Sequence, residues 1–211
     1  FKPAFEKRTV LYQPDISQVK GMLNETVEHR KAKKEEALWT SRMFGGMPTY
    51  QINTNYPNNW LSKLHQVMQL GLPHPVGWFF VLFVGMFILL MALRLDPWVA
   101  VIGAMAYSFS TYFMVAMEAG HNAKITALGY APAVIGGMLM TFRGRWFLGG
   151  IIFTLALGLE LFANHFQITY YTMLMAGILG IYFLVKALKE KDLKDGFLIP
   201  SGALVVGLLL A

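Results

Sequence analysis

The chain has no cysteine and little charge. Of its 211 residues, 14% are Asp, Glu, Lys or Arg, whereas a soluble domain typically has about 25%. The lack of cysteine excludes disulfide bonds and thiolate metal sites. The sequence also has no Walker, Rossmann, zincin or nucleophile-elbow motif, so none of those sites is indicated. The low charge and the 55% hydrophobic content together indicate a membrane protein.

Long apolar runs follow a polar N-terminal segment, and the complete runs come close to the ~20 residues that cross a ~30 Å hydrocarbon core. We expect spans at 76–93, 98–117, 125–142, 146–162, 168–185 and 197–211, the last cut off by the chain end. A single helix over 146–185 would be about twice the core thickness, so we expect a turn near Asn164-His165. The sequence predicts an all-α polytopic bundle over 75–211 and a long loop with short amphipathic helices over 1–74.

Basic residues alternate between the connectors. Those after the first, third and fifth runs hold Arg94, Arg143, Arg145, Lys186, Lys189, Lys191 and Lys194, whereas the opposite short connectors hold Lys124 alone. The positive-inside rule puts the basic set in the cytoplasm and residues 1–74 outside. We read the net charge of +6 as topology and lipid-surface contacts, with no nucleic-acid partner. Because the chain begins at Phe1, we also expect a preceding span and a C-terminal remainder to be missing.

The outer segment has its own local signals. A helix is predicted from Asp15, with Ile16, Val19, Leu23 and Val27 on one face. The glycine pair in residues 44–48 predicts a loop, which is either a plain turn or a close approach to a ligand. A second helix, capped by Asn58 or Asn59, is expected to place Trp60, Leu61, Leu64, Val67 and Met68 on an apolar side at the membrane interface.

Asp15 is the first candidate functional residue. With Gln18 three positions later, it fits a capping box at a helix start. A carboxylate at a membrane surface also suits a general base that takes a proton from an attacking hydroxyl. The residues alone leave both interpretations open.

The connector at 118–124 is the second candidate. It carries Glu118, His121, Asn122 and Lys124 within seven residues. One interpretation is a solvated loop whose lysine extends to the interface. The other is a polar wall that binds a phosphate or a sugar.

The third candidate is the outer end of the fifth span. Tyr170 fits an interfacial aromatic belt, but the belt does not account for His165 and Gln167. Glu160 lies about one turn deeper, and an intramembrane carboxylate costs on the order of 3 kcal/mol. We therefore expect it to face the bundle interior, with Asn164 within reach as a partner.

Four motifs together resemble the bacterial YfhO membrane-protein family. They read QPDISQ (13–18), LWT followed by MFGGMP (38–48), GHNAK (120–124) and NHFQITYY (164–171). That family is similar to the GT-C polytopic glycosyltransferases, which use polyprenyl-phosphate sugars on the outer face of the cytoplasmic membrane. The resemblance covers nearly the whole chain and implies a GT-C-like N-terminal fragment that lacks its first span.

The resemblance also implies roles. Asp15 matches the acidic catalytic residue of the first external loop, as general base of an inverting transfer to a cell-envelope acceptor. The supporting wall would comprise Gln18, Glu118, His121, Asn122 and Lys124, and donor binding would fall to Arg42, His165, Gln167 and Tyr170. A divalent metal is possible, with Asp15 and Glu118 as oxygen ligands.

Two other functions remain open from the residues. Glu160 with a nearby histidine suits a transporter or flippase that relays protons or holds a substrate. Alternatively, the chain is a scaffold that presents its outer loop to an envelope partner.

Overall fold

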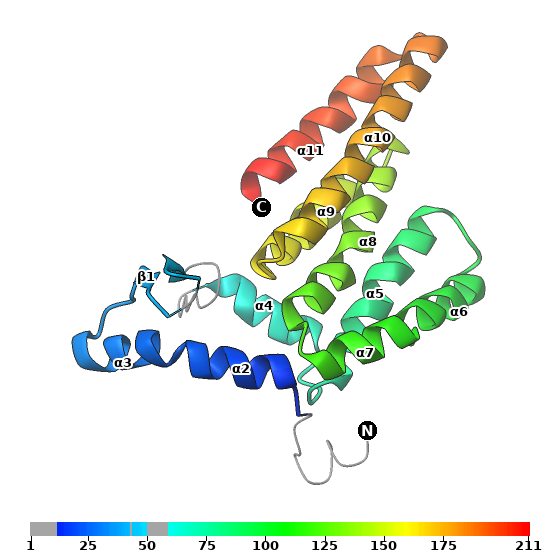
Figure 1. Ribbon diagram of the computed structural model, residues 1–211. Coiled ribbons are helices and arrows are strands. Elements are labelled where there is room, and N and C mark those ends of the chain that lie inside the picture. The colour runs from blue at the N-terminus through cyan, green and yellow to red at the C-terminus, as the bar shows by residue number, and fades with distance from the viewer. Residues whose placement is uncertain (1–11, 43, 50–58) are drawn as a thin grey trace.

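The computed structural model describes residues 12–42, 44–49 and 59–211. This part of the chain is mainly helical, as expected (Figure 1). The N-terminal segment holds α2 (Pro14–Met22), α3 (Asn24–Lys33), β1 (Trp39–Thr40), β2 (Met47–Pro48) and α4 (Trp60–Met68). The bundle holds α5 (Val76–Ala92), α6 (Pro97–Ser108), α7 (Thr111–Ala119), α8 (Asn122–Phe142), α9 (Trp146–Phe162), α10 (Phe166–Glu190), the π-helix η2 (Lys194–Leu198) and α11 (Ile199–Leu210).

Helix α8 is the central helix, and glycines bring its neighbours close. A Cβ atom added at Gly85 of α5 would lie 1.8 Å from the carbonyl oxygen of Gly129 in α8. On the side facing α9, a Cβ at Gly137 would lie 2.5 Å from the amide nitrogen of Phe153. Such small residues allow the backbones to touch, which is how membrane helices gain packing energy where no water drives them together.

A proline inside α8 is compensated by a side chain from α6. Pro132 has no N–H, so it cannot donate to the carbonyl of Leu128 four residues earlier. The hydroxyl of Tyr107 donates to that carbonyl instead, over 3.0 Å. The freed backbone oxygen is therefore satisfied inside the bundle, as an apolar surrounding requires.

Three segments in the described part of the chain are long and apolar enough to cross a membrane: Pro97–Ala119, Asn122–Phe142 and Phe166–Glu190. These correspond to the expected spans at 98–117, 125–142 and 168–185. Helices α5 and α9 are apolar but have 17 residues each, and the first long segment is interrupted between α6 and α7. The expected turn is confirmed, because Asn164 adopts a φ of 55° and α10 begins two residues later.

The connectors alternate between the two ends of the bundle (Figure 1). The α7–α8 and α9–α10 turns line one pocket together, next to the start of α2. The α5–α6 and α8–α9 turns and the α10–η2 connector line another pocket at the opposite end. The basic connectors therefore share one end, while the compartment that each end faces remains a prediction.

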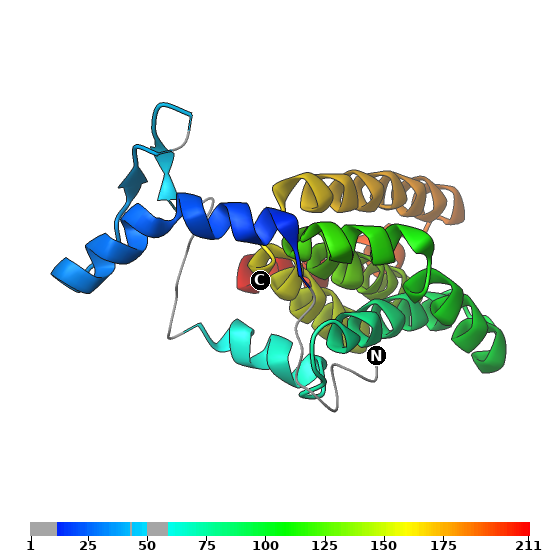
Figure 2. The ribbon, with the colours of Figure 1, turned by 60° about the horizontal axis from the view of Figure 1, so that its bottom comes forward.

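Helices α2 and α3 project sideways from the bundle (Figures 1 and 2). The predicted start at Asp15 is one residue late, because Pro14 is the first helical residue and its fixed φ suits that position. The helix also stops at Met22, so Leu23 separates α2 from α3. Of the two interpretations of Asp15, the capping box is contradicted, because the N-cap is Gln13 and its side chain makes no cap hydrogen bond.

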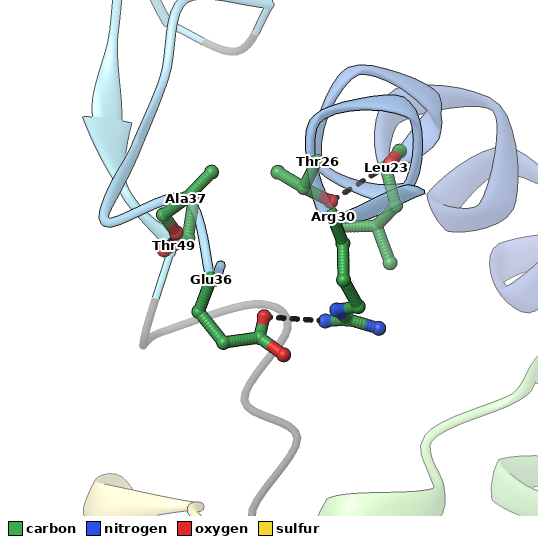
Figure 3. Close-up of polar contacts among 6 residues, drawn as sticks. All are labelled: Leu23, Thr26, Arg30, Glu36, Ala37 and Thr49. Atoms are coloured by element: carbon green, nitrogen blue, oxygen red, sulfur yellow. Dashed lines mark hydrogen bonds and ion pairs between the residues drawn. The ribbon is translucent and has the colours of Figure 1, made fainter. Parts of the chain in front are cut away.

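A short hairpin, which the sequence reasoning missed, lies beside α3. The predicted glycine loop connects β1 and β2, and Gly45 and Gly46 have φ values of 76° and 122°. Glu25 of α3 accepts a hydrogen bond from the Thr40 hydroxyl at 2.8 Å. Arg30 forms an ion pair with Glu36 at 2.6 Å (Figure 3). These contacts attach the hairpin to α3, away from the bundle.

Helix α4 is capped by Asn59, as expected, through a 2.9 Å hydrogen bond from the amide of Leu61; Asn58 lies outside the described residues. Its predicted apolar side is divided in two. Leu61, Leu64 and Met68 pack on the bundle, whereas Trp60 and Val67 are exposed. The helix is therefore tied to the bundle as well as amphipathic.

Candidate functional site

A pocket of about 440 Å³ lies where α2 meets the α7–α8 and α9–α10 turns. Figure 2 shows the first turn of α2 against this end of the bundle. We call it the junction pocket; its lining comes from Ile16, Gly120, His121, Asn122, Ala123, Lys124 and His165. The structure therefore combines the second and third sequence candidates with the start of α2.

Asp15 contacts His121 across this junction. Its Oδ2 atom lies 3.1 Å from Nε2 of His121, and the two side chains are 49% and 51% exposed. Asp15 does not line the pocket, whereas His121 does. An exposed ion pair adds little stability, so the contact matters mainly because it places an acid and an imidazole side by side at the rim.

Gly120 permits the close approach. It ends α7 with a φ of 105°, a backbone conformation that residues with a side chain rarely adopt. A Cβ atom there would lie 3.2 Å from Ile16 and 3.3 Å from the Cβ of Asp15. The glycine thus makes the turn and leaves room for α2.

Gln13, which the sequence reasoning missed, fastens α2 at this point. Its buried amide Nε2 donates to the carbonyl of Met117 at 2.6 Å and to Oδ1 of Asn122 at 2.9 Å. Asn122 donates back to Oε1 of Gln13 at 3.2 Å. The amide of Asn122, expected to hold a ligand, is therefore largely engaged in holding α2. Nothing local in the sequence marks Gln13, since its partners are more than a hundred positions away.

Lys124 gives the pocket a positive charge, and His165 adds an imidazole ring to its lining. The ammonium of Lys124 lies 5.2 Å from the ring centre of Tyr112, a cation–π distance. Burial, and then the charges of Lys124 and His121, lower the pKa of His165, while a backbone hydrogen bond opposes this. Its Nδ1 accepts from the amide of Ile168, so the neutral ring carries its proton on Nε2. A phosphate would find a fixed cation and an N–H donor here.

Other candidates lie outside the pocket lining. Gln18 and Glu118 are exposed on α2 and α7. Arg42 is exposed just after β1. Gln167 and Tyr170 are exposed on α10. The structure brings none of these five into the junction pocket.

Glu160 is fully buried in α9, with 0% exposure. Its Oε1 accepts a 2.8 Å hydrogen bond from the hydroxyl of Thr172 in α10, a donor that the sequence reasoning did not nominate. Within the described residues its Oε2 has no hydrogen-bond partner. An unsatisfied carboxyl oxygen in an apolar bundle is costly, so it is a candidate for a bound proton or substrate.

The possible metal site gains no support. Among the residues that the structure describes, no group of three or more His, Asp or Glu side chains gathers as a metal site would need. No family model, curated protein or solved structure matches the chain.

Proposed function

We propose that the chain belongs to a membrane glycosyltransferase at the outer face of the bacterial cytoplasmic membrane. It would move a sugar from a polyprenyl-phosphate donor to a hydroxyl of an envelope polymer or lipid, with inversion. The observation that carries the proposal is the pairing of Asp15 with His121 beside a pocket that also presents Lys124 and His165. The resemblance to the YfhO family and the GT-C fold points to the same chemistry.

In this reaction the acceptor oxygen attacks the anomeric carbon while the bond from that carbon to the phosphate oxygen breaks. The carboxylate of Asp15 takes the acceptor's proton. His121 binds Oδ2 of Asp15, which leaves Oδ1 for that proton. The polyprenyl phosphate leaves with the bonding electrons as an anion, which Lys124 and the N–H of His165 stabilise. The phosphate is a good leaving group, so a strong general acid is unnecessary.

The test is sugar transfer by membranes that contain the full-length protein. Membranes with wild-type protein, Asp15→Asn or His121→Gln are incubated with a panel of radiolabelled polyprenyl-phosphate hexoses. Loss of a general base typically lowers the rate about 100- to 10,000-fold. We expect that loss for Asp15→Asn, and a smaller loss for His121→Gln, which orients the carboxylate.

Asp195→Asn is the matched control. Asp195 is an exposed acid in η2, at the opposite end of the bundle. Its substitution therefore removes the same charge without changing the junction pocket. Transfer at the wild-type rate by Asp15→Asn, at equal expression, would remove Asp15 from the mechanism. Equal loss in all three variants would point to general destabilisation.

The second candidate function is transport, and the free Oε2 of Glu160 favours it. A buried carboxyl that exchanges a proton between helices suits proton-coupled movement of a substrate. Two variants tested in two assays distinguish the two candidate functions. Proton uptake by proteoliposomes that is lost in Glu160→Gln and kept in Asp15→Asn supports transport, and the reverse pattern in sugar transfer supports the glycosyltransferase.

A further inference from the structure

Three arginines gather at the end of the bundle opposite the junction pocket. Arg94 comes from the α5–α6 turn, and Arg143 and Arg145 come from the α8–α9 turn. They surround a hollow of about 280 Å³ whose apolar wall includes Met91, Leu95 and Met140. We call this the arginine cluster; it combines dense positive charge with an apolar floor.

The acids near the cluster do not form close ion pairs with its arginines in the described part of the chain. In residues 12–42, 44–49 and 59–211, no carboxylate forms an ion pair with any of the three guanidinium groups. The nearest acid in sequence, Asp96, caps α6 through its Oδ1 atom, which accepts from the amides of Trp98 and Val99. An adjoining hollow shares Arg94 and Arg143 and is also lined by three acids, Glu190, Asp192 and Asp195. Glu190 faces Lys186 at 3.9 Å, and among the described residues neither aspartate lies within ion-pair distance of an arginine.

One arginine is already fixed in place. The guanidinium of Arg143 donates through Nη1 to the carbonyl of Ala92, the last residue of α5. This contact joins the two turns and also satisfies a helix-terminal carbonyl. Arg94 and Arg145 are exposed, and their side chains form no hydrogen bond with the described residues. Two guanidinium groups beside a fixed third are thus available to a ligand.

The cluster lies at the level where headgroups would be found. Trp98 opens α6 and is 77% exposed, and Trp146 opens α9 and is 51% exposed. Exposed tryptophans at the ends of apolar helices are typical of the interface between hydrocarbon and water. Each follows its arginine by four residues or fewer in the sequence, so the arginines are at headgroup depth when the helices are in a bilayer.

We propose that the arginine cluster binds the headgroup phosphate of an anionic phospholipid, with an acyl chain on the apolar wall. Guanidinium groups bind phosphate oxygens in pairs of parallel hydrogen bonds, which lysine cannot match. Basic pockets between membrane helices bind anionic headgroups for this reason. Met91, Leu95 and Met140 favour a lipid over a soluble phosphate, because a free anion gains nothing from an apolar floor.

The test compares lipids and charge-matched variants. Purified protein in neutral detergent is mixed with phosphatidylglycerol or phosphatidylcholine, and lipid retention is read by native mass spectrometry together with the melting temperature. We expect wild-type protein to retain phosphatidylglycerol and to melt higher with it than with phosphatidylcholine. Arg94→Gln/Arg145→Gln should weaken phosphatidylglycerol binding at least tenfold, and Arg94→Lys/Arg145→Lys should give an intermediate loss.

Lys189→Gln/Lys191→Gln is the matched control, since it removes two exposed positive charges at the same end of the bundle but outside the hollow. It should bind as wild type does. Equal weakening by both double variants would overturn the site in favour of general charge. Equal retention of the two lipids would overturn it as well. Stabilisation by inorganic phosphate alone, to the same degree, would assign the cluster to a soluble anion instead of a lipid.

Discussion

Replacing Gln13 by leucine should release α2 from the junction pocket. The change keeps the side chain's approximate volume and removes both polar atoms. Met117 then loses a donor to its carbonyl, and Asn122 loses both a donor and an acceptor. Leaving such groups unsatisfied costs about 1–3 kcal/mol. That range corresponds to a shift in the docking equilibrium of about 5- to 150-fold.

Few other contacts oppose that shift. The pair of Asp15 and His121 is half exposed, and exposed pairs contribute about 0–1 kcal/mol. Ile16 against Gly120 is a small apolar contact. The amide exchange is therefore a large share of what holds the first turn of α2, and the variant should carry Asp15 away from His121.

The absence of cysteine provides a clean assay. Single cysteines at Glu28 in α3 and Phe166 in α10, both exposed, can carry spin labels for a double electron–electron resonance measurement. We expect a narrow distance distribution in the parent and a broad one in Gln13→Leu. Gln18→Leu, an exposed glutamine on the same helix, should stay narrow. A narrow distribution in Gln13→Leu would refute the reasoning, because the amides would then not be what docks α2.

Three further predictions concern the bundle and α4. Gly85→Ala should destabilise the fold by about 1–3 kcal/mol through overpacking. Gly177→Ala is the control and should be neutral or slightly stabilising, because a Cβ there meets nothing within 4 Å. The melting temperatures of the two variants in detergent distinguish these outcomes. Tyr107→Phe should cost about 1 kcal/mol, because the carbonyl of Leu128 loses its donor; unchanged stability in a denaturant titration would contradict this. Burial lowers the pKa of His65. As the pH falls, this histidine is therefore protonated in the unfolded chain before it is protonated in the folded one. The melting temperature should then fall as pH drops below about 6.5, and His65→Gln should flatten that slope in a pH series.

The sequence predicted features that depend on neighbours in the chain. The turn at Asn164-His165 follows from the length of the apolar run. The Asn59 cap follows from the preference of asparagine for the N-cap position, where its side chain accepts from a nearby amide. The break between α6 and α7 was missed because the apolar pattern continues across Phe109. The two-residue strands were missed because a hairpin so short depends on its attachment to Glu25 and not on alternation.

The sequence predicted only part of the candidate site, because some of its contacts join residues far apart in the chain. Residue types identified His121 and Lys124 in one candidate and His165 in another, because unusual polar side chains were crowded into short connectors. They did not identify Gln13, since an amide before a proline is an ordinary loop residue until its distant partner is known. Thr172 as the donor to Glu160 was hidden in the same way, since its register on α10 depends on packing across the α9–α10 turn.

Helix α8 contributes to both proposed binding sites, and its length determines how they relate. It begins at Asn122, beside the junction pocket, and ends at Phe142, directly before Arg143. Its 21 residues rise about 32 Å at 1.5 Å per residue, close to the ~30 Å of a hydrocarbon core. Because the two ends of α8 lie about one hydrocarbon core apart, a lipid-linked donor at one end and a phospholipid at the other would meet opposite leaflets and would not compete for one headgroup layer. The phospholipid would then act on the transfer reaction only by fixing the height of α8 in the bilayer, which is the height of Lys124 relative to the donor phosphate.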